Sequence, residues 1–95
     1  MTSAKAHILV VDDEPLVLDS LTGLLREWGY SVTSCKNAGD ALDRFQRNEI
    51  DIVLTDIKMP HMSGIDLLAK IHTINKETPV ILLTANAEMD VAVAG

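Results

Sequence analysis

The stretch HILVVDDE at residues 7–14 decides the fold of this chain, because a short apolar run leads directly into three acidic residues. Two further runs end in a similar way. IVLTD covers residues 52–56 and VILLT covers residues 80–84, so each run stops on a side chain that carries oxygen. Short, continuous apolar runs are typical of strands that are buried on both faces of a parallel sheet. Ligands of such sheets bind beyond the carboxyl ends of the strands, where these oxygen-bearing side chains fall.

Helical patterns lie between these runs. Over residues 15–28, apolar side chains recur at helical spacing, with Pro15 in the first turn and Gly29 as a natural stop. Asn37 can cap a second helix, which ends near residue 48. Each helix would therefore connect one strand to the next.

A loop and a third helix follow the run that ends on Asp56. Pro60 and Gly64 hold the loop over residues 58–64, and a helical pattern covers residues 65–74. The apolar positions that mark the faces of the three helices are Val17, Leu18, Leu21, Leu24, Leu25, Trp28, Ala38, Ala41, Leu42, Phe45, Ile65, Leu68, Ile71 and Ile74.

The order of these patterns predicts the fold class. Residues 30–35 mix Ser and Thr with Val32, which indicates a short strand at an edge of the sheet. Strands that alternate with helices form a parallel sheet with right-handed crossovers and helices on both faces. We therefore expect an α/β fold with a doubly wound parallel sheet, in a single domain over residues 1–95. Residues 87–95 indicate the start of a fourth helix.

Composition and charge narrow the classes of function. The chain carries a formal net charge of −6 and has no stretch rich in Lys or Arg, which argues against nucleic acid or an anionic membrane as a partner of this segment. No apolar run approaches the ~20 residues of a membrane span, and the N-terminus lacks a secretory signal, so the cytoplasm is the expected location. The single cysteine, Cys35, falls in a strand-like run, which favours a buried and unreactive thiol.

The residues at the strand ends predict a shared site. Asp12 and Asp13 follow the first run, Asp56 ends the second and Thr84 ends the third. Each acid alone could cap a helix or belong to a loop, but together at one sheet edge they favour a joint role. Clustered carboxylates repel one another unless a cation lies among them, and oxygen ligands favour a hard ion such as Mg²⁺. A carboxylate beside Mg²⁺ can also attack phosphorus and form an aspartyl phosphate.

Three sequence blocks carry a resemblance to a known family. They are VVDDE at residues 10–14, DIKMPHMSG at residues 56–64 and LTA at residues 83–85. Their order and spacing resemble the signature of receiver domains in two-component response regulators. The resemblance implies a phosphoacceptor domain, rather than an enzyme. Such a domain takes a phosphoryl group from a sensor histidine kinase, here on Asp56, and switches conformation to control an output.

The resemblance also implies roles for single residues. By that resemblance, Asp13 and Asp56 hold Mg²⁺ directly, and Asp12 acts largely through a water. The main-chain carbonyl of Lys58 would be the remaining protein ligand. Thr84 would hydrogen-bond a phosphoryl oxygen and move inward on phosphorylation.

The chain departs from the family's pattern at its C-terminal end. Receiver domains continue into a fifth strand, which ends in a Lys that pairs with the phosphoryl group, and into a fifth helix; this chain ends at Gly95, before them. The family's sheet order is 2-1-3-4-5, so the missing strand would leave the fourth with an uncovered edge. We therefore expect a receiver domain that is incomplete at its C-terminus and an output domain outside this chain. A homodimer or an exchange of segments would cover the bare edge.

Other classes of protein share parts of this pattern. A phosphoryl-transfer enzyme of the haloacid-dehalogenase type also uses a strand-end Asp and Mg²⁺, but it would need a second Asp where Lys58 stands. A flavodoxin would need a Ser/Thr/Gly-rich loop after the first strand, and residues 12–15 have the opposite electrostatic character. A receiver with only an interaction role is the main alternative, because the acidic cluster is intact but the family's Lys is absent.

Overall fold

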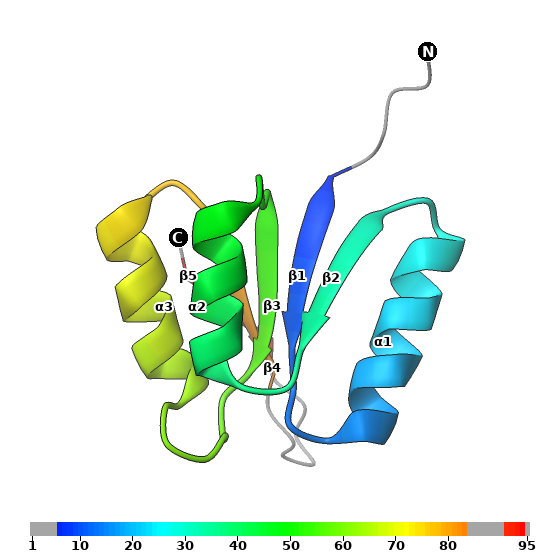
Figure 1. Cartoon of the computed structure of the whole chain (residues 1–95), viewed down its shortest axis with the longest axis horizontal. Helices are drawn as coiled ribbons and strands as arrows, with labels where there is room; N and C mark the ends of the chain where they lie inside the picture. Colours follow the sequence, from blue (N-terminus) through cyan, green and yellow to red (C-terminus); the bar gives the residue numbers. More distant parts are fainter. Residues whose placement is uncertain (1–5, 84–90, 95) are drawn as a thin grey trace.

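The computed structural model describes residues 6–83 and 91–94, which form one five-stranded sheet with helices on both faces (Figure 1). The sheet order is β2-β1-β3-β4-β5, and the first four strands pair in parallel. This confirms the predicted doubly wound α/β fold. The strands are β1 (His7–Val11), β2 (Ser31–Cys35), β3 (Ile52–Asp56), β4 (Val80–Leu83) and β5 (Val91–Ala94), and the helices are α1 (Pro15–Glu27), α2 (Ala38–Arg47) and α3 (Gly64–Ile74).

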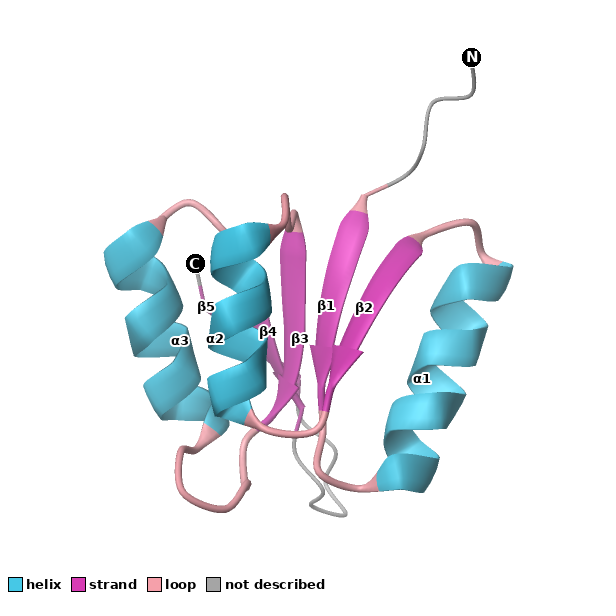
Figure 2. Ribbon diagram, in the orientation of Figure 1, coloured by secondary structure: helices cyan, strands magenta, loops and turns pink. Residues whose placement is uncertain are grey.

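The two faces of the sheet carry separate apolar cores. α1 lies on one face, and α2 and α3 lie side by side on the other (Figure 2). Successive residues of β1 point to opposite faces, so Leu9 and Val11 join the core beneath α2 and α3, whereas Ile8 and Val10 join the core beneath α1. Burial on both faces explains why the strands read as continuous apolar runs. Cys35 is buried as predicted, and this burial raises the pKa of its thiol.

Side-chain caps fix where α2 and α3 begin. The Oδ1 atom of Asn37 accepts a hydrogen bond from the backbone N–H of Asp40 at 2.7 Å, which confirms the predicted cap of α2. Ser63 does the same for α3, since its hydroxyl oxygen accepts from the N–H of Asp66 at 3.1 Å. Such caps satisfy backbone donors that have no partner inside the helix. None of the described helices is long and apolar enough to cross a membrane.

The buried face of α2 follows the predicted spacing, whereas that of α1 does so only in part. The buried side chains of α2 are Ala38, Ala41 and Phe45, all of which lie on the predicted face. Those of α1 are Leu18, Thr22 and Leu25, whereas Val17, Leu24 and Trp28, which the spacing places on the same face, are exposed. Only a narrow stripe of α1 is buried because α1 is the only described helix on its face of the sheet.

The rotation of α3 about its axis differs from the prediction. Ile65 and Ile74 are expected on the inner face, but their exposed fractions are 50% and 48%. Ile71 is buried and Leu68 is partly buried, as predicted, but the other two buried positions are Gly64 and Leu67. The reason is the first turn of the helix. Gly64 packs directly against the end of β3, and this contact turns the helix so that residues in line with Gly64 face the sheet.

The C-terminal end of the described chain also differs from the prediction. Residues 91–94 form a strand antiparallel to β4, with Leu83 opposite Val91 and Val80 opposite Ala94, so the predicted helix over residues 87–95 is wrong for this part. Residues 87–90 lie outside the described chain. The unpaired N–H and C=O groups at the edge of β4 favour an added strand, and the alternating valines of VAVA suit one. The edge of β4 is therefore covered, which removes the reason for expecting a homodimer or segment exchange there.

Candidate metal centre

Three carboxylates meet at the carboxyl edge of the sheet. Asp12 and Asp13 directly follow β1, and Asp56 is the last residue of β3. Because β1 and β3 are neighbours, with Val11 opposite Thr55, the two strands deliver these side chains to the same place. One carboxylate oxygen from each of the three residues lies within 4.8 Å of the others. The predicted convergence of the three acids is therefore confirmed.

The local backbone holds Asp12 in a defined position. Its N–H donates to the carbonyl of Cys35 at 3.1 Å, which continues the pairing of β1 with β2 beyond the strand. Its Oδ1 atom accepts from the N–H of Glu14 at 2.8 Å, just before α1 begins. The helix-cap interpretation thus holds in part, because this carboxylate satisfies one backbone donor beside the helix start. Its second oxygen remains available to a ligand.

Burial and mutual repulsion both disfavour the negative charges of the three carboxylates. Asp12 is 5% exposed, whereas Asp56 is half-buried and Asp13 is exposed. Burial raises the pKa of Asp12, and the charges of Asp56, Asp13 and Glu14 raise it further, while the hydrogen bond from the N–H of Glu14 works in the opposite direction. A cation among the three carboxylates would offset both the burial and the repulsion.

The geometry of the donors fits Mg²⁺. This ion holds six oxygens at about 2.1 Å, so neighbouring ligand oxygens lie about 3 Å apart and opposite ones about 4.2 Å. The three carboxylate oxygens lie within 4.8 Å of one another, so the cluster has the size that one such ion and its water ligands would need. All three donors are hard oxygen atoms of the kind that Mg²⁺ prefers over softer ligands.

We expect Asp12→Asn to stabilise the metal-free protein at neutral pH by about 1 kcal/mol, the size of an ordinary single substitution. The folded protein binds the Asp12 proton more tightly than the unfolded chain does. Ionisation of this group therefore lowers stability as pH rises from the ordinary value of 3.8 towards the raised pKa. Urea unfolding with a chelator present should show a gap between variant and parent that is constant at neutral pH and closes below pH 3.8. A gap that persists at low pH would contradict the electrostatic explanation.

The loop after β3 packs tightly against Asp56. The N–H of Gly64 donates to the carbonyl of Ile57 at 2.8 Å. A Cβ atom added to Gly64 would lie 2.1 Å from the carbonyl oxygen of Asp56, so no larger residue fits there. His61 within this loop adopts a φ of 73°, which is uncommon for a residue other than glycine. The prediction that Gly64 shapes the loop over the site is consistent with this contact.

Lys58 and Thr84 are the other two residues that the sequence predicts for the site. Lys58 is exposed and stands in the loop two residues after Asp56, so its main chain lies next to the acidic cluster in sequence; its role as a ligand remains a prediction. Thr84 lies outside the described residues. Sequence reasoning missed Thr55, whose hydroxyl donates to the carbonyl of Asp56 at 2.9 Å. The available signal was a hydroxyl-bearing residue within an otherwise apolar run.

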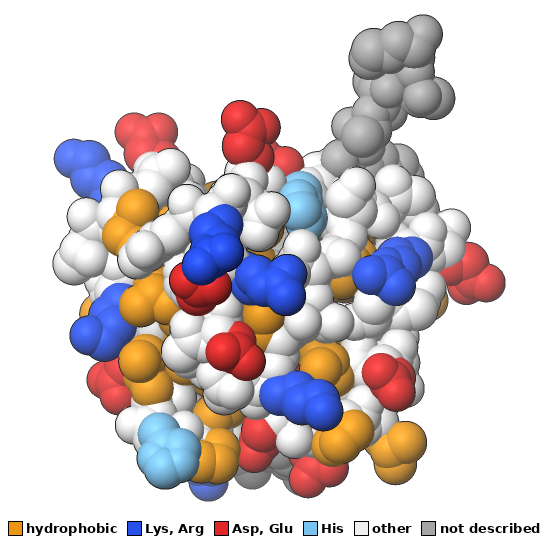
Figure 3. All heavy atoms as spheres, viewed as in Figure 1, with side chains coloured by type: hydrophobic (Ala, Val, Ile, Leu, Met, Phe, Trp, Pro, Cys, Tyr) orange, Lys and Arg blue, Asp and Glu red, His pale blue; other side chains and the backbone are white. Residues whose placement is uncertain are grey.

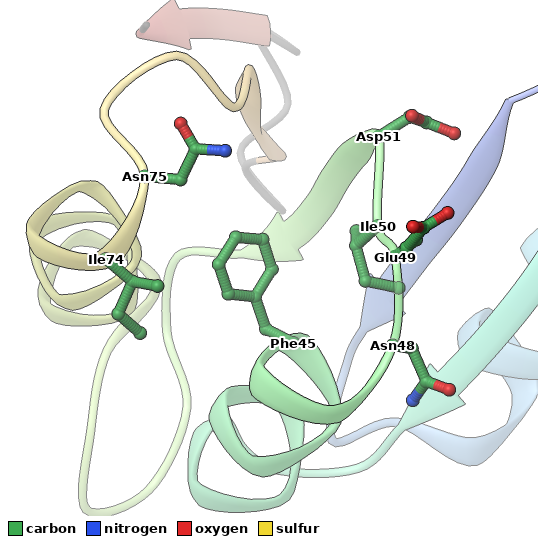
Figure 4. A pocket seen from close by; sticks show the side chains of 7 residues that line it. All are labelled: Phe45, Asn48, Glu49, Ile50, Asp51, Ile74 and Asn75. Atoms are coloured by element: carbon green, nitrogen blue, oxygen red, sulfur yellow. The ribbon is translucent and has the colours of Figure 1, made fainter.

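A pocket lies at the opposite end of the sheet, where α2 and α3 end (Figure 4). Three of its polar side chains already form hydrogen bonds with backbone groups. Asn48 donates to the carbonyl of Arg44, Asn75 accepts from the N–H of Glu77, and Asp51 accepts from the N–H of His7. Loop structure therefore explains this pocket without a ligand. Its lining consists of Phe45, Asn48, Glu49, Ile50, Asp51, Ile74 and Asn75.

Comparison with known proteins places this chain among signalling regulators. Residues 8–95 match the response regulator receiver domain family. The transcriptional regulatory protein ZraR of Klebsiella oxytoca is 41% identical over 93 residues, which are 98% of this chain and 21% of that protein. The chain thus spans about a fifth of the length of this curated relative.

Two solved structures share the fold. The response regulator TrrA of Thermotoga maritima, in complex with Mg²⁺-BeF, is 38% identical with a TM-score of 0.83, over 88% of this chain and 73% of that chain. A structure of TrrA in complex with the histidine kinase ThkA gives 38% identity and a TM-score of 0.80, over 90% of this chain and 76% of that chain. The family match over residues 8–95, the identity to ZraR and the shared fold together show that this chain belongs to the receiver domains of two-component response regulators, a regulatory family and not a family of catalytic enzymes.

Proposed function

We propose that Asp56 accepts a phosphoryl group from a sensor histidine kinase and that this phosphorylation switches the conformation of the domain. The observation that carries the proposal is the meeting of the three carboxylates of Asp12, Asp13 and Asp56 within 4.8 Å at one sheet edge. In this proposal, Asp13 and Asp56 bind Mg²⁺ directly, Asp12 acts largely through a water, and the main-chain carbonyl of Lys58 is a further ligand. Residues 1–95 then belong to a single receiver domain.

Phosphoryl transfer requires the protein mainly to position the carboxylate of Asp56 for attack on phosphorus. A carboxylate oxygen of Asp56 forms a new O–P bond as the P–N bond of the kinase's phosphohistidine breaks. The imidazole nitrogen keeps the bonding electron pair and takes up a proton from solvent. Bound Mg²⁺ supplies positive charge to the phosphoryl oxygens and to the carboxylates. The half-buried position of Asp56 at the strand end leaves one side open to a donor. Thr84 would hydrogen-bond a phosphoryl oxygen after transfer.

Relatives support the metal and the partner. TrrA, at 38% identity, was solved with Mg²⁺-BeF and, separately, in complex with a histidine kinase. The proposal carries both to this chain because the three acids that would bind the ion are brought together here. In this proposal a histidine kinase is the physiological phosphoryl donor, and we place this receiver domain in the cytoplasm.

We place the output domain of the protein outside residues 1–95. ZraR is about five times as long as the matched region and is named as a transcriptional regulator, which supports a C-terminal output domain that controls transcription. The receiver itself would not contact nucleic acid. The face formed by α2 and α3 shows basic and acidic side chains interspersed, without a continuous basic patch (Figure 3).

Incubation with acetyl phosphate tests the proposed function. We expect the purified protein to gain one phosphoryl group in the presence of Mg²⁺ and none with a chelator, as measured by intact-protein mass spectrometry. Peptide mapping after borohydride reduction should place the group on Asp56. A protein that binds its partners but gains no phosphoryl group under any metal condition would instead be a receiver with only an interaction role.

A further inference from the structure

Thr55 places a hydroxyl group inside the core, directly before the phosphoacceptor. Its side chain is fully buried (0% exposed). It lies opposite Val11 of β1 and Leu82 of β4 in the register of the sheet. Since Val53, two residues earlier, belongs to the core beneath α2 and α3, Thr55 points to the same face. A hydroxyl group among such apolar neighbours needs a hydrogen-bond partner close by.

The partner of this hydroxyl is the phosphoacceptor's own backbone. The Oγ1 atom of Thr55 donates to the carbonyl oxygen of Asp56 at 2.9 Å. The peptide group between Asp56 and Ile57 is also held elsewhere, because the N–H of Ile57 donates to the carbonyl of Leu83 at 3.1 Å. Hydrogen bonds at both ends of one peptide group fix its plane.

Gly64, at the start of α3, packs against the same peptide group. A Cβ atom at Gly64 would lie 2.1 Å from the carbonyl oxygen of Asp56 and 3.1 Å from the Cα atom of Ile57. The N–H of Gly64 donates to the carbonyl of Ile57 at 2.8 Å. The chain therefore leaves Asp56 through a backbone segment that both the hydroxyl of Thr55 and the backbone of Gly64 contact. This segment leads directly to Lys58.

We propose that Thr55 is a positioning residue for the metal and phosphoryl site, acting through the main chain of Asp56. Its hydroxyl fixes the Asp56–Ile57 peptide plane and thereby the direction of the Asp56 carboxylate and of the main chain at Lys58. This inference rests on the proposed function, because it assigns Thr55 a part in placing those ligands. A purely structural role would need only the volume of the side chain, which valine supplies equally well.

Three variants separate positioning from packing. Thr55→Val keeps the shape and removes the hydroxyl, whereas Thr55→Ser keeps the hydroxyl. Thr22→Val is the matched control, because Thr22 is also buried and its Oγ1 has no hydrogen-bond partner among the described residues. The measurements are the Mg²⁺ dissociation constant by calorimetry, the rate of phosphoryl gain from acetyl phosphate at saturating Mg²⁺, and urea unfolding.

We expect Thr55→Val to weaken Mg²⁺ binding and to slow phosphoryl gain by about tenfold each, the usual effect of losing a group that orients a metal ligand. Thr55→Ser and Thr22→Val should match the wild type in Mg²⁺ affinity and in the rate of phosphoryl gain, although Thr55→Ser loses a buried methyl group and should unfold at a lower urea concentration. If Thr55→Val matches it as well, the inference is overturned while the proposed function stands. If the wild type itself neither binds Mg²⁺ nor gains a phosphoryl group, the proposed function fails. Should the valine variant not fold, Thr55→Ser against Thr55→Ala repeats the same deletion of a hydroxyl and decides the question in the same way.

Discussion

Replacing Gly64 with alanine is expected to lower the free energy of unfolding by about 3 kcal/mol, the upper range for overpacking a filled site. The added Cβ would lie 2.1 Å from the carbonyl oxygen of Asp56 and 3.0 Å from its carbonyl carbon. Both are backbone atoms at the end of a central strand, so neither can rotate away. Either α3 or the loop after β3 must move, and the hydrogen bond from the N–H of Gly64 to the carbonyl of Ile57 is strained or lost.

Gly23→Ala in α1 is the matched control for this prediction. A Cβ atom at Gly23 would meet nothing within 4 Å, so alanine there should raise stability by about 0.5–1 kcal/mol through its better helix propensity. Urea unfolding of both variants measures the two effects with opposite signs. An alanine at position 64 that leaves stability and Mg²⁺ affinity unchanged would show that α3 is not fixed against β3.

Replacing Asp56 with asparagine is expected to abolish phosphoryl gain and to weaken Mg²⁺ binding by at least about tenfold. The amide has no anionic oxygen to attack phosphorus, and it removes one of the three charges that favour the cation. Its shape is nearly unchanged, so the fold should remain. Intact-protein mass spectrometry after reaction with acetyl phosphate, together with calorimetric Mg²⁺ titration, measures both effects.

Asp43→Asn is the control for the loss of one carboxylate elsewhere. Asp43 lies on the exposed side of α2 and forms an ion pair with Arg47 at 3.2 Å, an interaction worth at most about 1 kcal/mol at a surface. This variant should gain a phosphoryl group and bind Mg²⁺ as the parent does. Phosphoryl gain by Asp56→Asn at the parental rate would show that another residue is the acceptor.

The sheet and the acidic cluster could be predicted because each depends on local pattern plus one general rule. Continuous apolar runs separated by helical patterns predict parallel strands, and parallel strands bring their carboxyl ends to one edge. Asp12, Asp13 and Asp56 therefore meet even though about forty residues separate β1 from β3, as the register between Val11 and Thr55 requires. The mixture of Ser and Thr with Val32 predicts the edge position of β2, and the sheet order confirms it.

The remaining features depend on contacts that a sequence pattern does not contain. The rotation of α3 is set by the packing of Gly64 on the backbone of Asp56, which overrides the apolar periodicity that points to Ile65 and Ile74. The pairing of residues 91–94 with β4 depends on the unpaired backbone groups at the edge of that strand. The helical pattern in the sequence of these residues contains no information about that edge. The hydrogen bond of Thr55 likewise depends on the direction of one carbonyl.

A paramagnetic titration tests the central claim most directly, because Mn²⁺ takes the same oxygen ligands as Mg²⁺ and broadens the amide resonances near it. Sub-stoichiometric Mn²⁺ should first broaden the resonances of Asp12, Asp13 and Asp56 in the isotope-labelled protein, and excess Mg²⁺ should restore them. Broadening that begins instead at acids far from this edge, such as Asp40 or Glu49, with residues 12, 13 and 56 unaffected, would contradict the existence of a shared divalent-ion site.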